Sequence, residues 1–219
     1  MWVRSLIAVW LSALSFGAMA DECLPSEWGA ADQIGAANRI TPERTIAAAA
    51  LVRKGASHPL GIVSTPGMPA YPPRTTQLQV VQPDLHFRSE GSYKYGWKVS
   101  TNDDLVQMWL GTGPQIDGLG HLGEDGEFYN CHRGEDFSPI TGLTKLDISQ
   151  IPPLVARGVL INLAAHFGVD HLAAAQPVSS ADIQAAMTAQ GISVGEGDVV
   201  LFHTGWTDAK LSAAPQEWV

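Results

Sequence analysis

The chain has 219 residues, with 13 basic and 22 acidic side chains and a formal net charge of -9. No basic patch is present that could neutralise a phosphate backbone, which argues against nucleic acid as a partner. A small anion stays compatible with this charge if a bound metal supplies local positive charge.

The N-terminal segment has the pattern of a secretory signal. Arg4 precedes an apolar run from Leu6 to Phe16, and Ala18-Met19-Ala20 offers small residues for cleavage. We predict that residues 1–20 are removed and that residues 21–219 form one exported, periplasmic domain. No later stretch is long and apolar enough to span a bilayer, so no membrane association is expected. In an oxidising compartment Cys23 and Cys131 permit one disulfide without requiring it.

The first half of the chain predicts one helix and two strands. Thr41 is a helix cap followed by Pro42, and the helical pattern runs to Gly55, a natural stop. Among many prolines, Thr76 to Val81 alternates as an edge strand does. The run from Leu105 to Leu110 has the character of a mostly buried strand.

Strand and helix alternate in the second half. We predict a strand from Val155 to Ala164, a helix from the Ser179-Ser180 cap to Gln190 that stops at Gly191, and a strand from Asp198 to Thr204. Residues 213–219 provide neither a closing strand nor a capped helix. We therefore expect a chain truncated at its C-terminal side.

The segment 111–126 carries the most distinctive chemistry. Gln115, Asp117 and His121 follow the strand predicted at 105–110, among six glycines. If that strand continues through Asp117, its period of two places these three side chains on one face. Carboxylate and imidazole groups are common zinc ligands, and manganese accepts the same set with more oxygen. The alternative is structural: Asp117 caps a turn, and His121 is a hydrogen-bonded loop histidine.

These residues resemble the bacterial cyclase-like family that includes kynurenine formamidase. Its hallmark is His-x-Gly-Thr-His-x-Asp-x-Pro-x-His. Asp117 and His121 match the Asp and the last His, whereas Gly111 and Gln115 stand at the first two His positions. A longer-chain branch has Thr-Gln-x-Asp-Gly-Leu-x-His followed by Asp-Gly-x-Tyr-Asn, which is similar to residues 115–121 and 125–130.

Three further landmarks agree in order with the family. They are Trp28-Gly29-Ala30-Ala31-Asp32-Gln33-Ile34-Gly35-Ala36-Ala37-Asn38, Arg157-Gly158-Val159-Leu160 and Gly197-Asp198-Val199-Val200-Leu201-Phe202-His203-Thr204-Gly205-Trp206. The resemblance thus covers nearly all of the mature chain.

The resemblance implies an α/β fold with a mixed, barrel-like β-sheet and flanking helices, of the swivelling β/β/α type. It also implies a divalent metal, zinc or manganese, held by Asp117 and Gln115 and by a later His and Glu expected beyond Val219. His121 would be the general base or acid. The implied activity is hydrolysis of small aryl formamides or cyclic amides, as in tryptophan breakdown to kynurenine. Gly111 cannot coordinate through a side chain, and the Gln115 amide is a weaker ligand than imidazole.

Other side chains are candidates for a substrate pocket. His132 can approach from a returning loop or be merely solvated, and His203 is either a core histidine bonded to a main-chain group or a pocket wall. Trp206, like the group Tyr93, Tyr95 and Trp97, can stack on an aromatic substrate or simply pack. His58, His86, His166 and His171 are expected on the surface or in loops.

Two rival hypotheses stay open. The chain is either a metal-dependent amidohydrolase or a non-catalytic periplasmic small-molecule binding protein that keeps the pocket after losing two ligands. A third reading is that the chain is inactive without its missing end, which would leave a sheet edge exposed. Assembly into a homo-oligomer would agree with the family, and the expected partner is a small-molecule amide.

Overall fold

The computed structural model describes residues 23–81, 103–211, 213, 215 and 218. The elements in chain order are η1 (Gly35–Arg39), α1 (Pro42–Ala49), β1 (Thr76–Val81), β2 (Asp103–Met108), β3 (Glu127–Phe128), η3 (Tyr129–Cys131), β4 (His132–Arg133), α3 (Gly134–Phe137), η4 (Ile148–Gln150), β5 (Gly158–Asn162), α4 (Leu163–Phe167), α5 (Ser180–Gln190), β6 (Val199–His203) and α6 (Trp206–Lys210). The predicted signal segment 1–20 and the aromatic group at 93–97 lie outside the described residues. None of the described helices has the length and apolar character needed to cross a bilayer.

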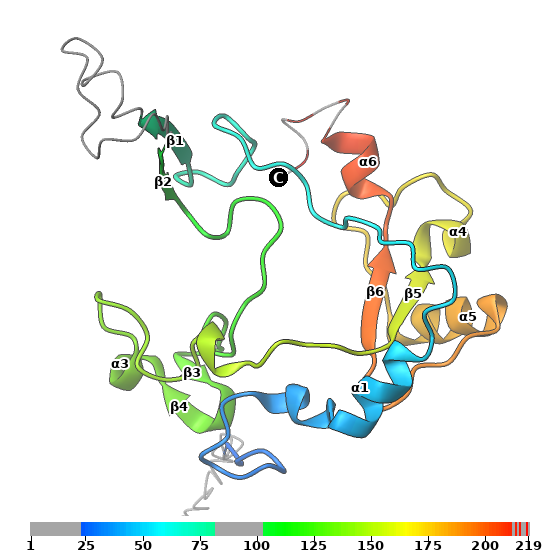
Figure 1. The fold of residues 1–219 in the computed structure, drawn as a ribbon, viewed down its shortest axis with the longest axis horizontal. Helices are drawn as coiled ribbons and strands as arrows, with labels where there is room; N and C mark the ends of the chain where they lie inside the picture. Colours follow the sequence, from blue (N-terminus) through cyan, green and yellow to red (C-terminus); the bar gives the residue numbers. More distant parts are fainter. Residues whose placement is uncertain (1–22, 82–102, 212, 214, 216–217, 219) are drawn as a thin grey trace, which may run out of the picture.

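The described strands form small sheets. There are three two-stranded sheets: β1–β2 and β3–β4 are antiparallel, and β5–β6 is parallel. Figure 1 shows them spaced around the molecule, with helices α4 and α5 beside β5 and β6. The mixed α/β class is therefore as predicted, but the described strands close no barrel.

The β1–β2 hairpin confirms one predicted strand and corrects another. β1 has the predicted bounds, whereas β2 begins and ends two residues before the predicted run of 105–110. The prediction that β2 is mostly buried is wrong, since Leu105 is 57% exposed and Val106 51% exposed. An apolar sequence indicates only that a strand can be buried, and this hairpin pairs with no third strand among the described residues.

Helix α1 starts where predicted and ends early. The Thr41 side chain accepts a hydrogen bond from the N–H of Arg44, and Pro42 is the first helical residue. The helix ends at Ala49 rather than running to Gly55, because the N–H groups of Leu51 and Val52 turn back to carbonyls three residues earlier.

The main buried core lies between β5–β6 and helices α4 and α5. Ile161, Leu163, Leu172 and Ala186 are each at most 6% exposed there. Ser179 forms a capping box with Asp182, and the helix stops at Gly191 with φ of 65°, as predicted. The predicted strands at 155–164 and 198–204 are shorter, covering Gly158–Asn162 and Val199–His203.

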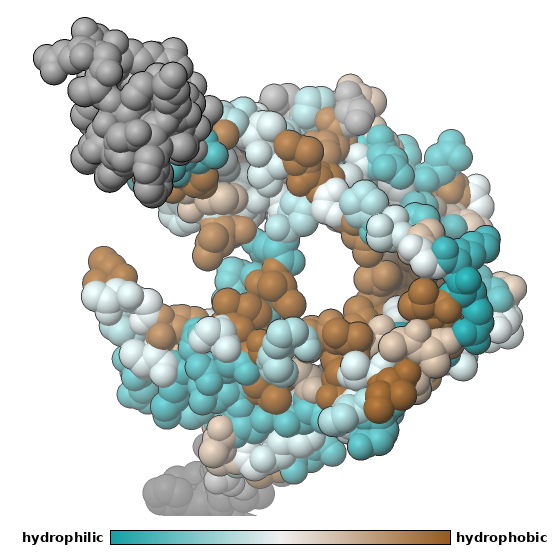
Figure 2. Space-filling model, viewed as in Figure 1, coloured by the Kyte–Doolittle hydropathy of each residue, from teal (hydrophilic) through white to brown (hydrophobic). Residues whose placement is uncertain are grey.

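Apolar side chains are also exposed in several places. Figure 2 shows apolar surface on the wall of an opening through the middle of the molecule. Leu60, Val63, Leu110 and Leu122 are exposed by 79%, 84%, 83% and 83%. The fully buried side chains outside the main core include Phe137 and Leu146, at 1% and 0% exposure. Both side chains lie next to Gly120, in the loop that carries Asp117.

Candidate active site

Gln115, Asp117 and His121 lie together, but a loop brings them together. The prediction that the strand continues through Asp117 is wrong: β2 ends at Met108, and the N–H of Thr112 closes a turn on the carbonyl of Trp109. Within the loop, Gln115 Nε2 donates to Asp117 Oδ2 at 3.2 Å. His121 Nδ1 lies 3.9 Å from Asp117 Oδ1.

The carboxylate and imidazole are both accessible. The side chains of Asp117 and His121 are 46% and 52% exposed. Asp117 hydrogen-bonds through its side chain to Gln115, and the main-chain N–H of His121 closes a turn on the carbonyl of Gly118. Among the described contacts, no main-chain group hydrogen-bonds to either side chain, and both the functional and the structural interpretation stay open.

Two glycines let this loop pack directly against the chain at Leu146. A Cβ atom on Gly118 would lie 2.8 Å from both the Leu146 carbonyl oxygen and the Ile148 nitrogen. Gly120 donates its N–H to the same Leu146 carbonyl at 2.9 Å. Only residues without a side chain allow two backbones to approach this closely. Asp117 lies in the sequence between β2 and these glycines, so the packing of the glycines against Leu146 fixes its position.

Leu146 is the residue against which the loop packs. Its side chain is completely buried, and its φ of 56° lies in the left-handed region that a leucine rarely adopts. The main-chain N–H of Leu146 donates to Gln33 Oε1 at 2.8 Å. Gln33 thereby stabilises the left-handed backbone of Leu146, whose carbonyl accepts the hydrogen bond from Gly120. Through this contact, the N-terminal segment of the described chain, residues 23–40, is connected to the site.

Asp32 joins the N-terminal segment to the β3–β4 hairpin. Its carboxylate accepts hydrogen bonds from Tyr129 Oη at 2.7 Å, Asn38 Nδ2 at 2.6 Å and the Gly35 N–H at 2.8 Å. Burial by itself would raise the pKa of Asp32, but the hydrogen bonds from Tyr129, Asn38 and the main chain outweigh it, and the pKa is lowered.

Asn130 also connects residues 26–32 to the β3–β4 hairpin. Its side chain accepts from the N–H of Ser26 at 2.7 Å and donates to the carbonyls of Gly29 and Asp32 at 2.9 and 2.8 Å. Both segments belong to the family landmarks, but nothing in their sequences predicts a role for Asp32 or Asn130. Their joint presence was the available signal that they meet.

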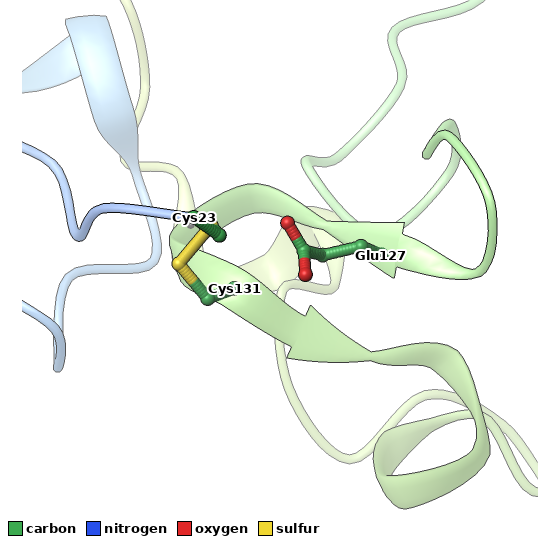
Figure 3. Close-up of side chains that lie close together, drawn as sticks. All are labelled: Cys23, Glu127 and Cys131. Atoms are coloured by element: carbon green, nitrogen blue, oxygen red, sulfur yellow. A yellow bond between two sulfur atoms is a disulfide. The ribbon is translucent and has the colours of Figure 1, made fainter. Parts of the chain in front are cut away.

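A disulfide closes the same junction. Cys23 and Cys131 are bonded, with their Cα atoms 5.7 Å apart (Figure 3). With Glu127 they form the one group of three His, Cys, Asp or Glu residues in the described chain whose atoms are near enough to share a metal ion. Metal binding needs thiolates, which a disulfide does not offer. The cysteines therefore connect the N-terminal segment to the hairpin.

The residues at Asp117 fit part of a metal site. Rotating the Gln115 amide by half a turn would place its oxygen where Nε2 now lies, 3.2 Å from Asp117 Oδ2. Two oxygens on one ion with bonds of about 2.1 Å are separated by roughly 3.0–3.4 Å. Asp117 and Gln115 can thus occupy two neighbouring coordination positions, with His121 beside them.

The remaining predicted pocket residues contact other elements. His132 is in β4 opposite Phe128, with its ring 6.2 Å from that of Phe137. Trp206 begins α6, lies 6.3 Å from the ring of His171 and donates Nε1 to the carbonyl of Trp218 at 3.0 Å. His132 therefore reaches the Asp117 loop only through Phe137, which lies against Gly120, and Trp206 contacts His171 and the C-terminal residues. A role of either residue in a substrate pocket stays a prediction.

His203 bonds to a side chain rather than to the expected main-chain group. Its Nδ1 lies 3.1 Å from Asn162 Oδ1, and the same oxygen accepts from the N–H of Ala165 at 2.9 Å. Because Asn162 Oδ1 accepts the hydrogen bond that caps helix α4, it also acts as an acceptor toward His203, and Nδ1 of His203 is the donor. In the neutral imidazole, Nε2 of His203 is then the acceptor. Asn162 and His203 are register partners at the carboxyl ends of β5 and β6.

Arg74 is a site neighbour that sequence reasoning missed. Its Nη1 donates to the carbonyl of Gly111 at 3.1 Å. A Cβ atom on Gly111 would collide with this guanidinium and would lie 3.1 Å from Gln115 Oε1. The position at which the family hallmark has its first His is therefore filled by an arginine from another segment. No local pattern around residue 74 signals this placement.

Comparison with known proteins agrees with this architecture. The family described as "Putative cyclase" matches residues 55–218. A solved structure described as a novel cyclase is similar over 83% of this chain and 62% of its own, with 29% sequence identity and a TM-score of 0.74. No curated protein matches the chain. The chain belongs to this cyclase family, and it spans 62% of the length of the solved structure that it resembles.

Proposed function

We propose that this protein is a metal-dependent hydrolase of small amides, with aryl formamides or cyclic amides as substrates. The observation that carries the proposal is the convergence of Asp117, Gln115 and His121 on one accessible loop, with His121 Nδ1 at 3.9 Å from the carboxylate. Family membership supports an enzyme, and the side-chain chemistry supports this reaction class.

Each residue has a separate task in the proposed reaction. Asp117 and Gln115 would hold zinc or manganese through their oxygens. When bound, such an ion lowers the pKa of a coordinated water and polarises the scissile carbonyl. Because Nδ1 of His121 faces Asp117, Nε2 is the nitrogen placed to accept the proton of the water and to return it to the leaving amine. The half-exposed loop gives a small amide direct access.

The test uses matched substitutions on the same protein. Asp117→Asn is expected to lower metal content after dialysis and affinity for added Zn²⁺ or Mn²⁺ by more than about 10-fold. Asp125→Asn is the control, because it makes the same charge change in the same loop, and asparagine tolerates its φ of 49°. Metal retention that is equal in both variants contradicts Asp117 as a ligand.

The role of His121 is tested by rate. His121→Gln is expected to reduce kcat for formanilide hydrolysis by about 10²–10⁴ while leaving metal content close to that of the wild type. His58→Gln is the matched control at an exposed loop position. If His121→Gln lost metal and activity together, a ligand role would replace the proton-transfer role.

A non-catalytic binding protein is the second candidate. The observation in its favour is Arg74, which fills the space beside Gly111 where the family hallmark has a ligand. A cation so near the loop disfavours a second positive charge there. Absence of bound metal and of turnover, together with saturable binding of a small amide, would favour this candidate.

The proposal also includes the cellular location of the protein and the extent of its β5–β6 sheet. We infer export to an oxidising compartment, where the Cys23–Cys131 disulfide is stable. Mass determination of the protein recovered from periplasm and cytoplasm tests removal of residues 1–20. We also infer that β5–β6 belongs to a larger, barrel-like sheet, because among the described residues each of these two strands has one unpaired edge.

A further inference from the structure

Arg74 is held beside the candidate active site by the β1–β2 hairpin. Its N–H closes a turn on the carbonyl of Tyr71 at 2.8 Å, just before β1. Across the hairpin, the N–H of Trp109 donates to the Thr75 carbonyl at 3.2 Å. This pairing extends the register of the two strands by one residue, to Thr75 and Trp109, and Arg74 follows directly, with its guanidinium within reach of the Gly111 carbonyl.

Within the described residues, no carboxylate forms an ion pair with Arg74. Among the described arginines, Arg39, Arg44 and Arg157 form ion pairs with glutamate or aspartate. Arg53 and Arg133 lack such a pair, but both are exposed to solvent. Arg74 is partly buried, and in the described structure its side chain donates only to the Gly111 carbonyl. A partly desolvated guanidinium with one neutral acceptor retains most of its five donors for an anion.

Gln115 separates this cation from the acidic side of the site. One end of its amide lies near Gly111, and the other end is 3.2 Å from Asp117 Oδ2. This order is the same in either orientation of the amide, including the one in which its oxygen would bind a metal. Arg74 and the loop together therefore present a guanidinium, an amide, a carboxylate and an imidazole in this order. A substrate whose reacting carbonyl lies at Asp117 and His121 can place an anionic group at Arg74.

We propose that Arg74 is a specificity-determining residue that binds the carboxylate of an anionic amide substrate. The guanidinium fork matches a carboxylate through two parallel, charge-assisted hydrogen bonds, which a neutral substrate cannot form. In a chain of net charge -9, this local cation offsets the general repulsion of an anion. The inference rests on the proposed function, since it names the substrate class of the same site.

Binding of a simple carboxylate tests Arg74 without requiring turnover. Benzoate and its neutral analogue benzamide are titrated calorimetrically into the wild-type protein and into Arg74→Gln, Arg74→Lys and the exposed control Arg53→Gln. Benzoate affinity is expected to fall about 10- to 100-fold in Arg74→Gln and less in Arg74→Lys, with no loss in Arg53→Gln. Thermal melting of each variant identifies a loss that comes from unfolding.

Turnover separates this inference from the proposed function. The ratio of kcat/KM for 2-formamidobenzoate to that for formanilide should fall about 10- to 100-fold in Arg74→Gln. Benzoate binding that is lost in Arg74→Gln, in a protein that hydrolyses neither amide, would support the anion site and reject the hydrolase. Equal benzoate binding by wild type and Arg74→Gln, or a wild-type protein that binds no benzoate, overturns the inference even if both amides are hydrolysed.

Discussion

Replacing Gly118 by alanine tests the packing that positions Asp117. The new methyl group would lie 2.8 Å from the Leu146 carbonyl oxygen, 2.8 Å from the Ile148 nitrogen and 3.1 Å from the Asp147 carbonyl carbon. All three are main-chain atoms, so no side chain can rotate to make room. The loop or the segment beneath it must move, and Asp117 moves with it.

The expected loss of stability follows from overpacking. Inserting a methyl group where backbone must shift costs about 1–3 kcal/mol, which for a chain of this size lowers Tm by roughly 2–4 °C per kcal/mol. Gly61→Ala is the matched control, because its Cβ meets nothing within 4 Å and its φ is not positive. That substitution removes only flexibility from the unfolded chain, worth about 0.4–1 kcal/mol in favour of the folded state.

Thermal unfolding followed by circular dichroism gives the stability difference, and Zn²⁺ titration reports whether the Asp117 site has shifted. The expected result is a Gly118→Ala protein with a Tm several degrees lower and weaker metal binding, beside a Gly61→Ala protein equal to the wild type or slightly more stable. If the two variants melt within about 1 °C of each other, the close approach of the loop to Leu146 is not a determinant of the site.

Three other predictions concern the stability of the fold. The disulfide joins Cys23 and Cys131 across 108 residues, so replacing both by serine should lower the free energy of unfolding by about 4–5 kcal/mol; melts with and without reductant should then agree for the variant and differ for the wild type. Hydrogen bonds lower the pKa of Asp32 in the folded state, so its contribution to the free energy of unfolding is present above the unfolded pKa and is lost as pH falls through the folded pKa. Tyr129→Phe removes one of these hydrogen bonds and should move the midpoint of acid unfolding to higher pH. An unchanged midpoint would show that the Tyr129 hydrogen bond does not stabilise the Asp32 carboxylate. Ser179→Ala should cost about 1 kcal/mol through loss of the α5 cap, measured as a lower midpoint in urea.

The sequence predicted that Gln115, Asp117 and His121 lie near one another, but not the backbone that brings them together; their roles stay predictions. The resemblance identified Asp117 and His121 as partners, and they do lie together. The continuous strand that was expected to align them does not exist, because the chain turns directly after β2. Gln33 contacts Leu146 across 113 positions and Asp32 contacts Tyr129 across 97, and local spacing cannot show contacts between residues so far apart.

The sequence by itself determined the local structure: the capped start of α1, the bounds of β1, and helix α5 with its Ser179 capping box and its stop at Gly191. Caps and glycine stops act within a few residues, so their effect is written in the neighbouring sequence. Tertiary structure alone decided the exposure of β2, the pairing of Cys23 with Cys131 and the placement of Arg74 against Gly111. Burial and ion pairing depend on which distant segment supplies the neighbouring surface.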